Sequence, residues 1–257
     1  MSFVFLRDTN HKHKGYTMNT LSKIILATLS SIALATNLQA HEHHNHVTEA
    51  NQQANTSCES CSVSKATQSS QILEAMHAPM HAHKPSASKS VEIDFLADMI
   101  PHHQGAIDSA KLLLPQTKNP QVALLAENII KAQEAEINEF KELIAKKGVK
   151  TTKVSAQEYK EFSQKNAKAN ESTMSGMTIE ESGDIDLDFL NAMIAHHTGA
   201  VESSDIVLSY TKDKKIQEIA KHIIDEQNTQ ITAMQKLIDD IKATKEEADK
   251  SKKPKKK

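Results

Sequence analysis

Aromatic residues and cysteines are scarce in this 257-residue chain, which has no tryptophan, three tyrosines, six phenylalanines and two cysteines. Two cysteines are too few for the disulfide framework of a small secreted protein. Because aromatic rings are few, we expect a core of leucine, isoleucine, alanine and methionine. No segment beyond residue 40 shows the alternation of a strand, so the sequence excludes a sheet fold.

Catalytic motifs and excess positive charge are also lacking. The sequence has no nucleophile–base pair, phosphate-binding loop or cofactor motif, so we do not expect an enzyme. Beyond residue 40 the chain has 27 basic and 32 acidic residues, a net charge of −5, and without the lysine-rich end at 250–257 the net charge is −11. Such a body repels nucleic acid and attracts cations. We expect residues 245–257 to be a disordered, solubilising tail.

The longest apolar run lies near the start of the chain. It extends from Ile24 to Ala35, follows Lys23, and precedes small residues that end at Ala40. This is the pattern of a secretory signal peptide, and the run is too short for a stable membrane span. We therefore predict that residues 1–40 are a signal peptide, with translation starting at Met1 or Met18, and that the mature protein is periplasmic.

One phrase occurs twice in the chain. DFLADMIPHHQGAIDSA begins at residue 94, and DFLNAMIAHHTGAVESS begins at residue 188. The offset of 94 residues continues without a gap, so that Ala126 and Gln133 match Ala220 and Gln227. The sequence therefore contains an internal duplication.

Each copy predicts a helical hairpin. In the first copy, apolar residues recur at helical spacing after a suitable N-cap at Ser90. A long second helix is expected between the N-cap Asn119 and Gly148, with Pro120 in its first turn. Two such hairpins would bury their apolar faces against each other, so we predict an all-α four-helix bundle.

The same patterns divide the chain. We expect a disordered arm over residues 41–90, because this stretch has little periodic hydrophobicity. The first hairpin then covers 91–148 and the second 185–244, with N-caps at Asp184 and Asp213. In the linker, 149–184, a capping box at Ser155 predicts a short helix that ends near Ala169.

The two histidine pairs, each preceded by a methionine, are the main candidate metal ligands. Residues three or four apart share one face of a helix, so each methionine adjoins both histidines that follow it. A thioether beside an imidazole suits copper better than magnesium or calcium. The alternative is that the methionines fill the core and that some of the histidines only pack. The candidates are Met99, His102, His103, Met193, His196 and His197.

A glycine follows each histidine pair, at Gly105 and Gly199. Glycine within a helix costs about 1 kcal/mol relative to alanine. Because both copies have one there, we expect another helix backbone to approach closely at these positions.

The run M-I-P-H-H-Q-G-A-I-D, followed by a helix with A-Q-x-x-E-I, resembles the ferritin-like "domain of unknown function 305" family. The resemblance covers roughly residues 91–145 and 185–240, and it implies a ferritin-like bundle. Tandem-copy secreted members of the family are associated with copper binding. The family pattern Q-x-x-E-I-x-x-M is incomplete in each copy, since Phe140 replaces the methionine in the first and Gln230 the glutamate in the second. Di-iron chemistry is disfavoured, because Glu-x-x-His occurs only at Glu74 and His77.

The predicted arm contains further candidate ligands. Cleavage after Ala40 would leave an amine that, with two backbone amides and the imidazole of His43, could form a square-planar site for Cu(II) or Ni(II). Cys58 and Cys61 could form a small disulfide or bind Cu(I), while a thioredoxin-like role is disfavoured because no βαβ pattern surrounds them. The remaining soft or imidazole donors of the arm and the linker are His41, His44, His46, Met76, His77, Met80, His81, His83, Met174 and Met177.

Together these features predict a periplasmic copper-binding protein that acts as a chaperone or buffer in copper tolerance. The expected partners are copper ions, as Cu(I) or Cu(II), and another copper-handling protein of the envelope is a further candidate partner. We expect no binding of nucleic acid and no stable membrane insertion. Two alternatives remain open from the sequence. One is a broader sequestrator of nickel, zinc or cobalt, and the other is a metal-free structural or adaptor bundle of the cell envelope.

Overall fold

The computed structural model describes residues 66–146 and 148–252, all within the unit Cys61–Lys257. These residues form six helices and no strand, which confirms the predicted all-α helical bundle. The helices are α1 (Gln68–Ala82), α2 (Val91–Leu113), α3 (Pro120–Ala145), α4 (Ala156–Met177), α5 (Ile185–Leu208) and α6 (Lys214–Lys252).

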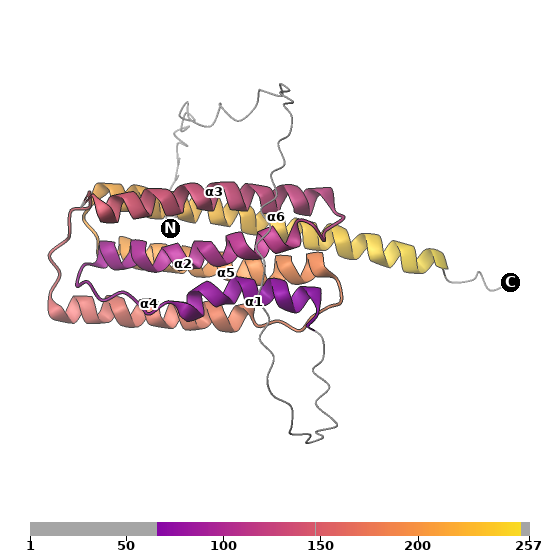
Figure 1. Cartoon of the computed structure of the whole chain (residues 1–257), viewed down its shortest axis with the longest axis horizontal. Helices are drawn as coiled ribbons and strands as arrows, with labels where there is room; N and C mark the ends of the chain where they lie inside the picture. Colours follow the sequence, from indigo (N-terminus) through magenta and orange to yellow (C-terminus); the bar gives the residue numbers. More distant parts are fainter. Residues whose placement is uncertain (1–65, 147, 253–257) are drawn as a thin grey trace, which may run out of the picture. The chain divides into compact units, whose positions relative to one another are not determined.

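The helices lie in three layers (Figure 1). The middle layer is α2 beside α5, with α3 and α6 on one side and α1 and α4 on the other. Helices covered on both sides must be apolar or small around most of their circumference. This holds for α2, where Phe95, Gly105 and Ile107 are all buried although they point in different directions around the helix.

The predicted hairpins are present, and the predicted caps begin their helices. The Ser90 Oγ accepts a hydrogen bond from the backbone N–H of Ile93, and the Asn119 side chain accepts from Gln121. Asp184 and Asp213 cap α5 and α6 in the same way. Side-chain caps of this kind satisfy backbone donors that the first helical turn leaves free.

The disorder predicted for residues 41–90 is wrong for residues 68–82, which form α1. Thr67 caps this helix, and Ile72, Leu73, Met76 and Met80 are buried along it. These residues are spaced for one helical face, but they are separated by glutamate, alanine, histidine and proline, which hid the stripe in the sequence. Residues 41–65 lie outside the described part of the chain.

Two other helices are longer than the sequence predicted. The capping box at Ser155 is present, but α4 continues past Ala169 to Met177, because Thr173 and Met177 extend its buried face. Similarly, α6 continues past Thr244 to Lys252, so a helix occupies residues that were expected to be disordered.

Gly105 and Gly199 mark two helix crossings. A Cβ atom at Gly105 would lie 2.2 Å from the backbone oxygen of Met76 in α1, so the predicted close approach of a backbone is confirmed there. At Gly199 the neighbour is a side chain of α4, since a Cβ atom would lie 1.9 Å from the Oγ1 of Thr173. The outer helix of each repeat therefore crosses the middle layer at the glycine after the histidine pair.

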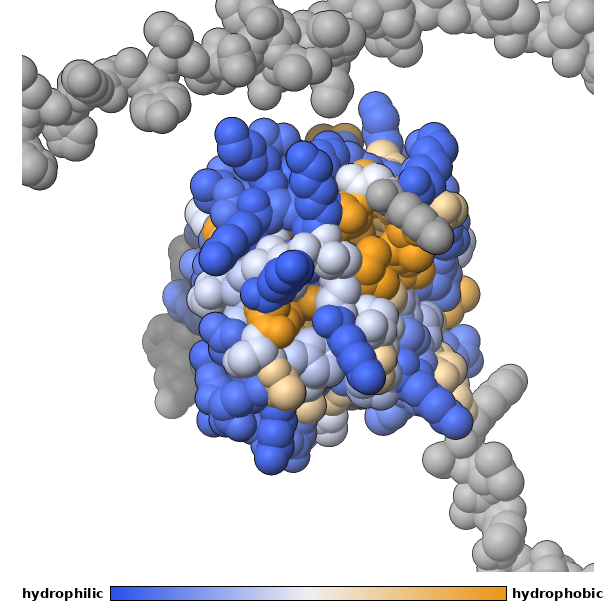
Figure 2. All heavy atoms as spheres, turned by 90° about the vertical axis from the view of Figure 1, so that its left-hand side faces the viewer, coloured by the Kyte–Doolittle hydropathy of each residue, from blue (hydrophilic) through white to orange (hydrophobic). Residues whose placement is uncertain are grey.

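Within the described residues, no helix has an apolar stretch long enough to cross a bilayer. Figure 2 shows one end of the bundle, where hydrophilic residues cover most of the visible surface and hydrophobic residues form small areas between them.

Candidate metal centre

His102 of α2 and His196 of α5 meet at the centre of the middle layer. Their ring centroids are 3.8 Å apart, and the planes of the rings are inclined by 41°. The Nε2 atom of His196 lies 2.9 Å from the backbone oxygen of His102. The two residues hold equivalent positions in the two repeats, so the duplication brings one histidine of each predicted pair together.

The second histidine of each pair faces the long helix of its own hairpin. The Nε2 atom of His103 lies 2.8 Å from Oε2 of Glu136, and the Nε2 atom of His197 lies 2.6 Å from Oε1 of Gln230. Glu136 and Gln230 are themselves equivalent across the repeat. The two hairpins therefore have the same register, with a carboxylate in one and an amide in the other.

Several of these imidazole nitrogens have no hydrogen-bond partner among the described residues. Neither ring nitrogen of His102 has one, and Nδ1 is unpartnered in His196 and His197. His103 is close to Glu136, but not at the angle of a hydrogen bond. Because most buried polar groups in proteins are hydrogen-bonded, such a group of unpartnered nitrogens is unusual.

Burial also fixes the protonation of these rings. It lowers the pKa of His102 and His196 well below the ordinary 6.5, with the neighbouring histidines acting in the same direction. Burial likewise lowers the pKa of His197 to about 4, against the hydrogen bond to Gln230, which raises it. At neutral pH the rings are therefore neutral, which is the form of histidine that binds metals.

A cavity of about 90 Å³ adjoins His102. Met80 of α1 and Met99 of α2 line it together with the His102 ring, and all three are buried. His83 and Asp98 also line it, with the His83 Nε2 atom 2.8 Å from the Asp98 Oδ1 atom. A single water-sized probe needs roughly 10–15 Å³, so the volume is sufficient for a small ion. The structure thus combines donors from the predicted arm with donors from the first histidine pair.

Other predicted methionine ligands are placed differently. Met193, the counterpart of Met99, is fully buried in an apolar cluster that also includes Met76 and Met177. Met174 is partly buried against that cluster. Met80 belongs to the same cluster although it also borders the cavity. The methionines of the predicted arm and linker therefore fill an apolar core, because the helices α1 and α4 place them in one.

His77 and His81 lie one turn apart on α1, with their ring centroids 6.1 Å apart. Burial and the nearby His81 lower the pKa of His77. These two rings are not among the residues that line the cavity. The remaining predictions, namely the signal peptide and the candidate ligands His41, His43, His44, His46, Cys58 and Cys61, lie outside the described residues.

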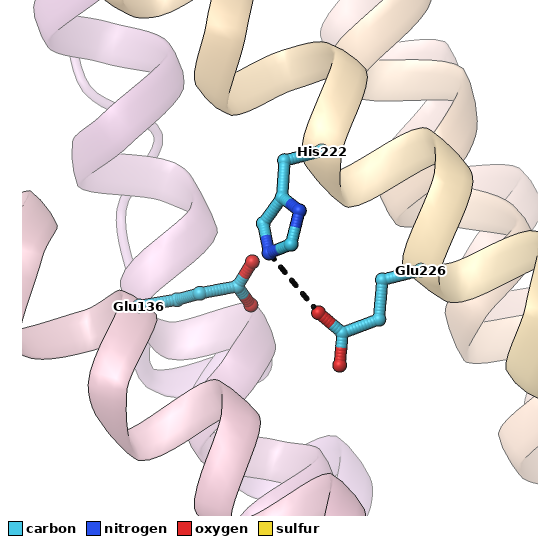
Figure 3. Close-up of side chains that lie close together, drawn as sticks. All are labelled: Glu136, His222 and Glu226. Atoms are coloured by element: carbon cyan, nitrogen blue, oxygen red, sulfur yellow. Dashed lines mark ion pairs between the residues drawn. The ribbon is translucent and has the colours of Figure 1, made fainter. Parts of the chain in front are cut away.

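A second group of donors was not predicted from the sequence. Glu136 of α3 faces His222 and Glu226 of α6, as Figure 3 shows, and their ligand atoms all lie within 4.8 Å of one another. His222 and Glu226 are one turn apart, with 3.3 Å between Nε2 and Oε2. Their i, i+4 spacing on a predicted helix was the available signal, but it could not reveal that Glu136 lies opposite.

The comparisons with known proteins identify the family. Residues 92–252 match the model of the domain of unknown function, DUF305, so the match includes α2 to α6 but not α1. A stretch of 50 residues is 42% identical to an uncharacterized protein of Acanthamoeba polyphaga mimivirus. That match covers 20% of this chain and only 33% of the viral protein.

A solved structure, described as a DUF305 fragment from Deinococcus radiodurans, is also similar. Its sequence is 22% identical, and the alignment covers 60% of this chain and 98% of the fragment, with a TM-score of 0.43. The family model itself matches well over half of the 257 residues. This chain therefore belongs to the DUF305 family.

Proposed function

We propose that this protein binds copper in the periplasm and acts there as a chaperone or buffer, and not as an enzyme. In this proposal it is a tandem-copy, copper-binding member of its family, and α2, α3, α5 and α6 correspond to a ferritin-like four-helix core. Histidines before residue 65 would capture ions, and the bundle would hold them until another envelope protein accepts them.

The cavity beside His102 is the observation that carries the proposal. Two thioethers, from Met80 and Met99, and one imidazole line it. Thioether and imidazole donors favour Cu(I) over harder cations, because soft ligands prefer soft ions. The imidazole is neutral and its ring nitrogens are unpartnered, so it could bind an ion without first losing a proton or a hydrogen bond.

Charge near the cavity also supports a cation as the ligand. The residues that line the cavity include two carboxylates, Asp94 and Asp98, and no lysine or arginine. Asp94 is satisfied by hydrogen bonds from the backbone of Ser88 and from Tyr159. Both contacts of Asp98, with His83 and with the backbone N–H of Ser86, are made to Oδ1, so its Oδ2 has no hydrogen bond among the described residues and remains available to an incoming ion.

The duplication provides a matched test of the proposal. Met99 and Met193 are equivalent and both are buried in apolar clusters, but only Met99 also lines the cavity. We would measure the affinity of the full chain for Cu(I) by competition with a chromophoric chelator, in Met99→Leu and Met193→Leu. Leucine is close in volume to methionine, so both variants should fold.

We expect Met99→Leu, and Met80→Leu likewise, to weaken Cu(I) binding at the bundle by about tenfold or more, and Met193→Leu to leave it unchanged. A loss of one soft ligand at roughly 1.4 kcal/mol corresponds to that factor. Equal affinities in the two variants would contradict the cavity site. If zinc, nickel or cobalt bind as tightly as copper without the methionines, the protein is a broader sequestrator, and if none binds, it is a metal-free scaffold.

A further inference from the structure

Glu136, His222 and Glu226 form a cluster outside the copper cavity. None of the three lines that cavity, which lies among α1, α2, α4 and α5, whereas the cluster joins α3 to α6. We propose that this cluster is a second cation site, which binds a divalent ion of the Zn²⁺ type between the two long helices. The site does not depend on the copper proposal, because it shares no ligand with it.

The geometry of the cluster suits a shared ion. The three ligand atoms come from two helices and already lie within 4.8 Å of one another, with the side chains pointing toward a common point (Figure 3). Glu136 is buried, Glu226 is half-buried and His222 is exposed, so the cluster is held by the bundle on one side and reached from solvent on the other.

A residue outside the cluster contacts each carboxylate, and one of the two contacts is a hydrogen bond. The Nε2 atom of Gln230 donates a hydrogen bond of 3.0 Å to Oε1 of Glu226, which leaves Oε2 directed toward His222. The fully buried His103 places Nε2 2.8 Å from Oε2 of Glu136, without the alignment of a hydrogen bond. Metal-binding side chains are commonly held by such outer partners, which fix the orientation of the ligand before the ion binds.

Charge favours a cation at this point. Among the described residues, neither Glu136 nor Glu226 forms an ion pair with lysine or arginine, and the nitrogen donors beside them are histidines. The adjacent Glu139 is neutralised separately by Lys215. The nearby carboxylates, Glu226 first, raise the pKa of His222. Two carboxylates thus share one exposed imidazole, and a divalent ion would neutralise them more completely.

The donor set selects the type of ion. One imidazole and two carboxylates, without sulfur, match the nitrogen and oxygen ligands of Zn²⁺, and three protein ligands leave a fourth position for water. Cu(I), which prefers thioethers and thiolates, fits the methionine-lined cavity better. The bundle would therefore bind a soft ion, Cu(I), in the cavity and a borderline ion, Zn²⁺, at the cluster.

The repeat makes the site unique in the bundle. The positions equivalent to Glu136, His222 and Glu226 are Gln230, Asn128 and Ala132, and these cannot provide the same charge or ligands. We therefore expect one equivalent of Zn²⁺ at this cluster. Histidines elsewhere in the chain can also bind zinc, so the test depends on a difference between variants.

The experiment measures zinc content after equilibrium dialysis of the full chain, together with the shift in melting temperature that Zn²⁺ causes. The variants are His222→Ala and Glu226→Gln, and the control is Glu134→Gln, which lies on α3 but pairs with Lys111. His222 is exposed, so its loss should not unfold the protein, and melting without metal checks this. An ion that binds only the native state stabilises it, and the stabilisation grows with the ratio of the free ion concentration to the dissociation constant.

We expect each site variant to lose one equivalent of Zn²⁺, or to bind it more than about tenfold more weakly, since loss of an outer partner alone costs roughly 10–100-fold. The rise in melting temperature with Zn²⁺ should shrink in the site variants and persist in Glu134→Gln. Binding of Cu(I) should be the same in all. Zinc content and melting shifts equal to those of the unaltered protein in both site variants would overturn the proposal.

Discussion

Ser69 of α1 donates a hydrogen bond of 2.7 Å from its Oγ to the Oδ2 of Asp188, at the start of α5. Across the bundle, the Tyr159 hydroxyl of α4 donates to Asp94, at the start of α2. Asp94 and Asp188 are equivalent in the repeat, and each also accepts a backbone hydrogen bond, from Ser88 or Ser182, at 2.8 Å. The structural repeat is therefore three helices, with the first helix of each repeat attached to the other repeat.

These crossed hydrogen bonds should stabilise the bundle to a similar extent. Ser69→Ala and Tyr159→Phe each remove one donor from a buried or partly buried carboxylate, and we expect each to lower the free energy of unfolding by about 1–3 kcal/mol. Urea unfolding followed by circular dichroism measures the change. Ser163→Ala is the control, because its hydroxyl bonds only to the backbone of its own helix. A cost no larger than that of the control would show that the crossed bonds are dispensable.

The two glycines should respond differently to alanine. In Gly105→Ala the new Cβ atom meets a backbone oxygen, which can move only if α1 moves, so we expect a loss of about 1–3 kcal/mol in the free energy of unfolding. In Gly199→Ala the Cβ atom meets the Thr173 side chain. Adding Thr173→Ala removes the closest atoms, and alanine is favoured over glycine in a helix by about 1 kcal/mol.

Thermal unfolding of the single and double variants checks this difference. We expect the double variant Gly199→Ala/Thr173→Ala to recover most of the stability that Gly199→Ala loses. The matching pair Gly105→Ala/Met76→Ala should not recover, since the clash is with the backbone of Met76. Recovery in both pairs would mean that α1 is not held tightly at this crossing.

The sequence predicted the hairpins well because the signals for them lie within short stretches of the chain. The caps at Ser90 and Asn119 and the apolar spacing can each be recognised from consecutive residues. The helices α1 and α4 were harder, since few of their residues are apolar and their stability comes from packing on α2 and α5. A mostly polar segment with one buried residue per turn cannot be distinguished from a linker by its composition, because its helix is stabilised by the surface on which it packs.

For the site, the sequence identified the histidine pairs. It did not show that one histidine of each pair meets its counterpart while the other faces the long helix of its own hairpin. The duplication shows that His102 and His196 are equivalent, but only the packing of α2 on α5 shows that they meet. It could not show that Met99 borders a cavity and Met193 does not. The cluster of Glu136, His222 and Glu226 joins residues of different repeats. Their counterparts are residues of other types, so no repeated pattern pointed to the cluster.

Acid should destabilise the metal-free protein. Burial lowers the pKa of His102 and His196 well below 6.5 and that of His197 to about 4. In the unfolded chain these rings bind protons near pH 6.5, so below that pH the unfolded state holds protons that the folded state does not. The free energy of unfolding should therefore fall as the pH drops from 6.5 toward 4, by about 1.4 kcal/mol per pH unit for each such histidine.

His222 acts in the opposite sense, since nearby carboxylates raise its pKa, and its contribution is present below 6.5 and lost as the pH rises through the raised value. The three buried histidines together change the free energy of unfolding with pH more than His222 does. Urea unfolding from pH 7 to 4.5 in the presence of a chelator measures the slope. His197→Gln should flatten it, whereas His222→Ala should steepen it slightly, and a stability that is constant over this range would refute the prediction.

Asp98 should assist copper binding through its charge. Its carboxylate lies at the cavity, four residues before His102, and the equivalent position in the second repeat is Ala192. We expect Asp98→Asn to weaken Cu(I) binding about two- to tenfold at low salt, because a partly exposed charge near a cation contributes roughly 1 kcal/mol. The effect should shrink at high ionic strength, where the Debye length is only about 3 Å at 1 M.

The control is Asp108→Asn, because Asp108 lies on the same helix, bonds to Gln104 and does not line the cavity. Competition with a Cu(I) chelator at two salt concentrations would measure both variants. A salt-independent loss in Asp98→Asn would indicate direct ligation by the carboxylate, or a change in the position of His83, instead of long-range attraction. No loss at low salt would show that the cavity attracts copper through its neutral donors alone.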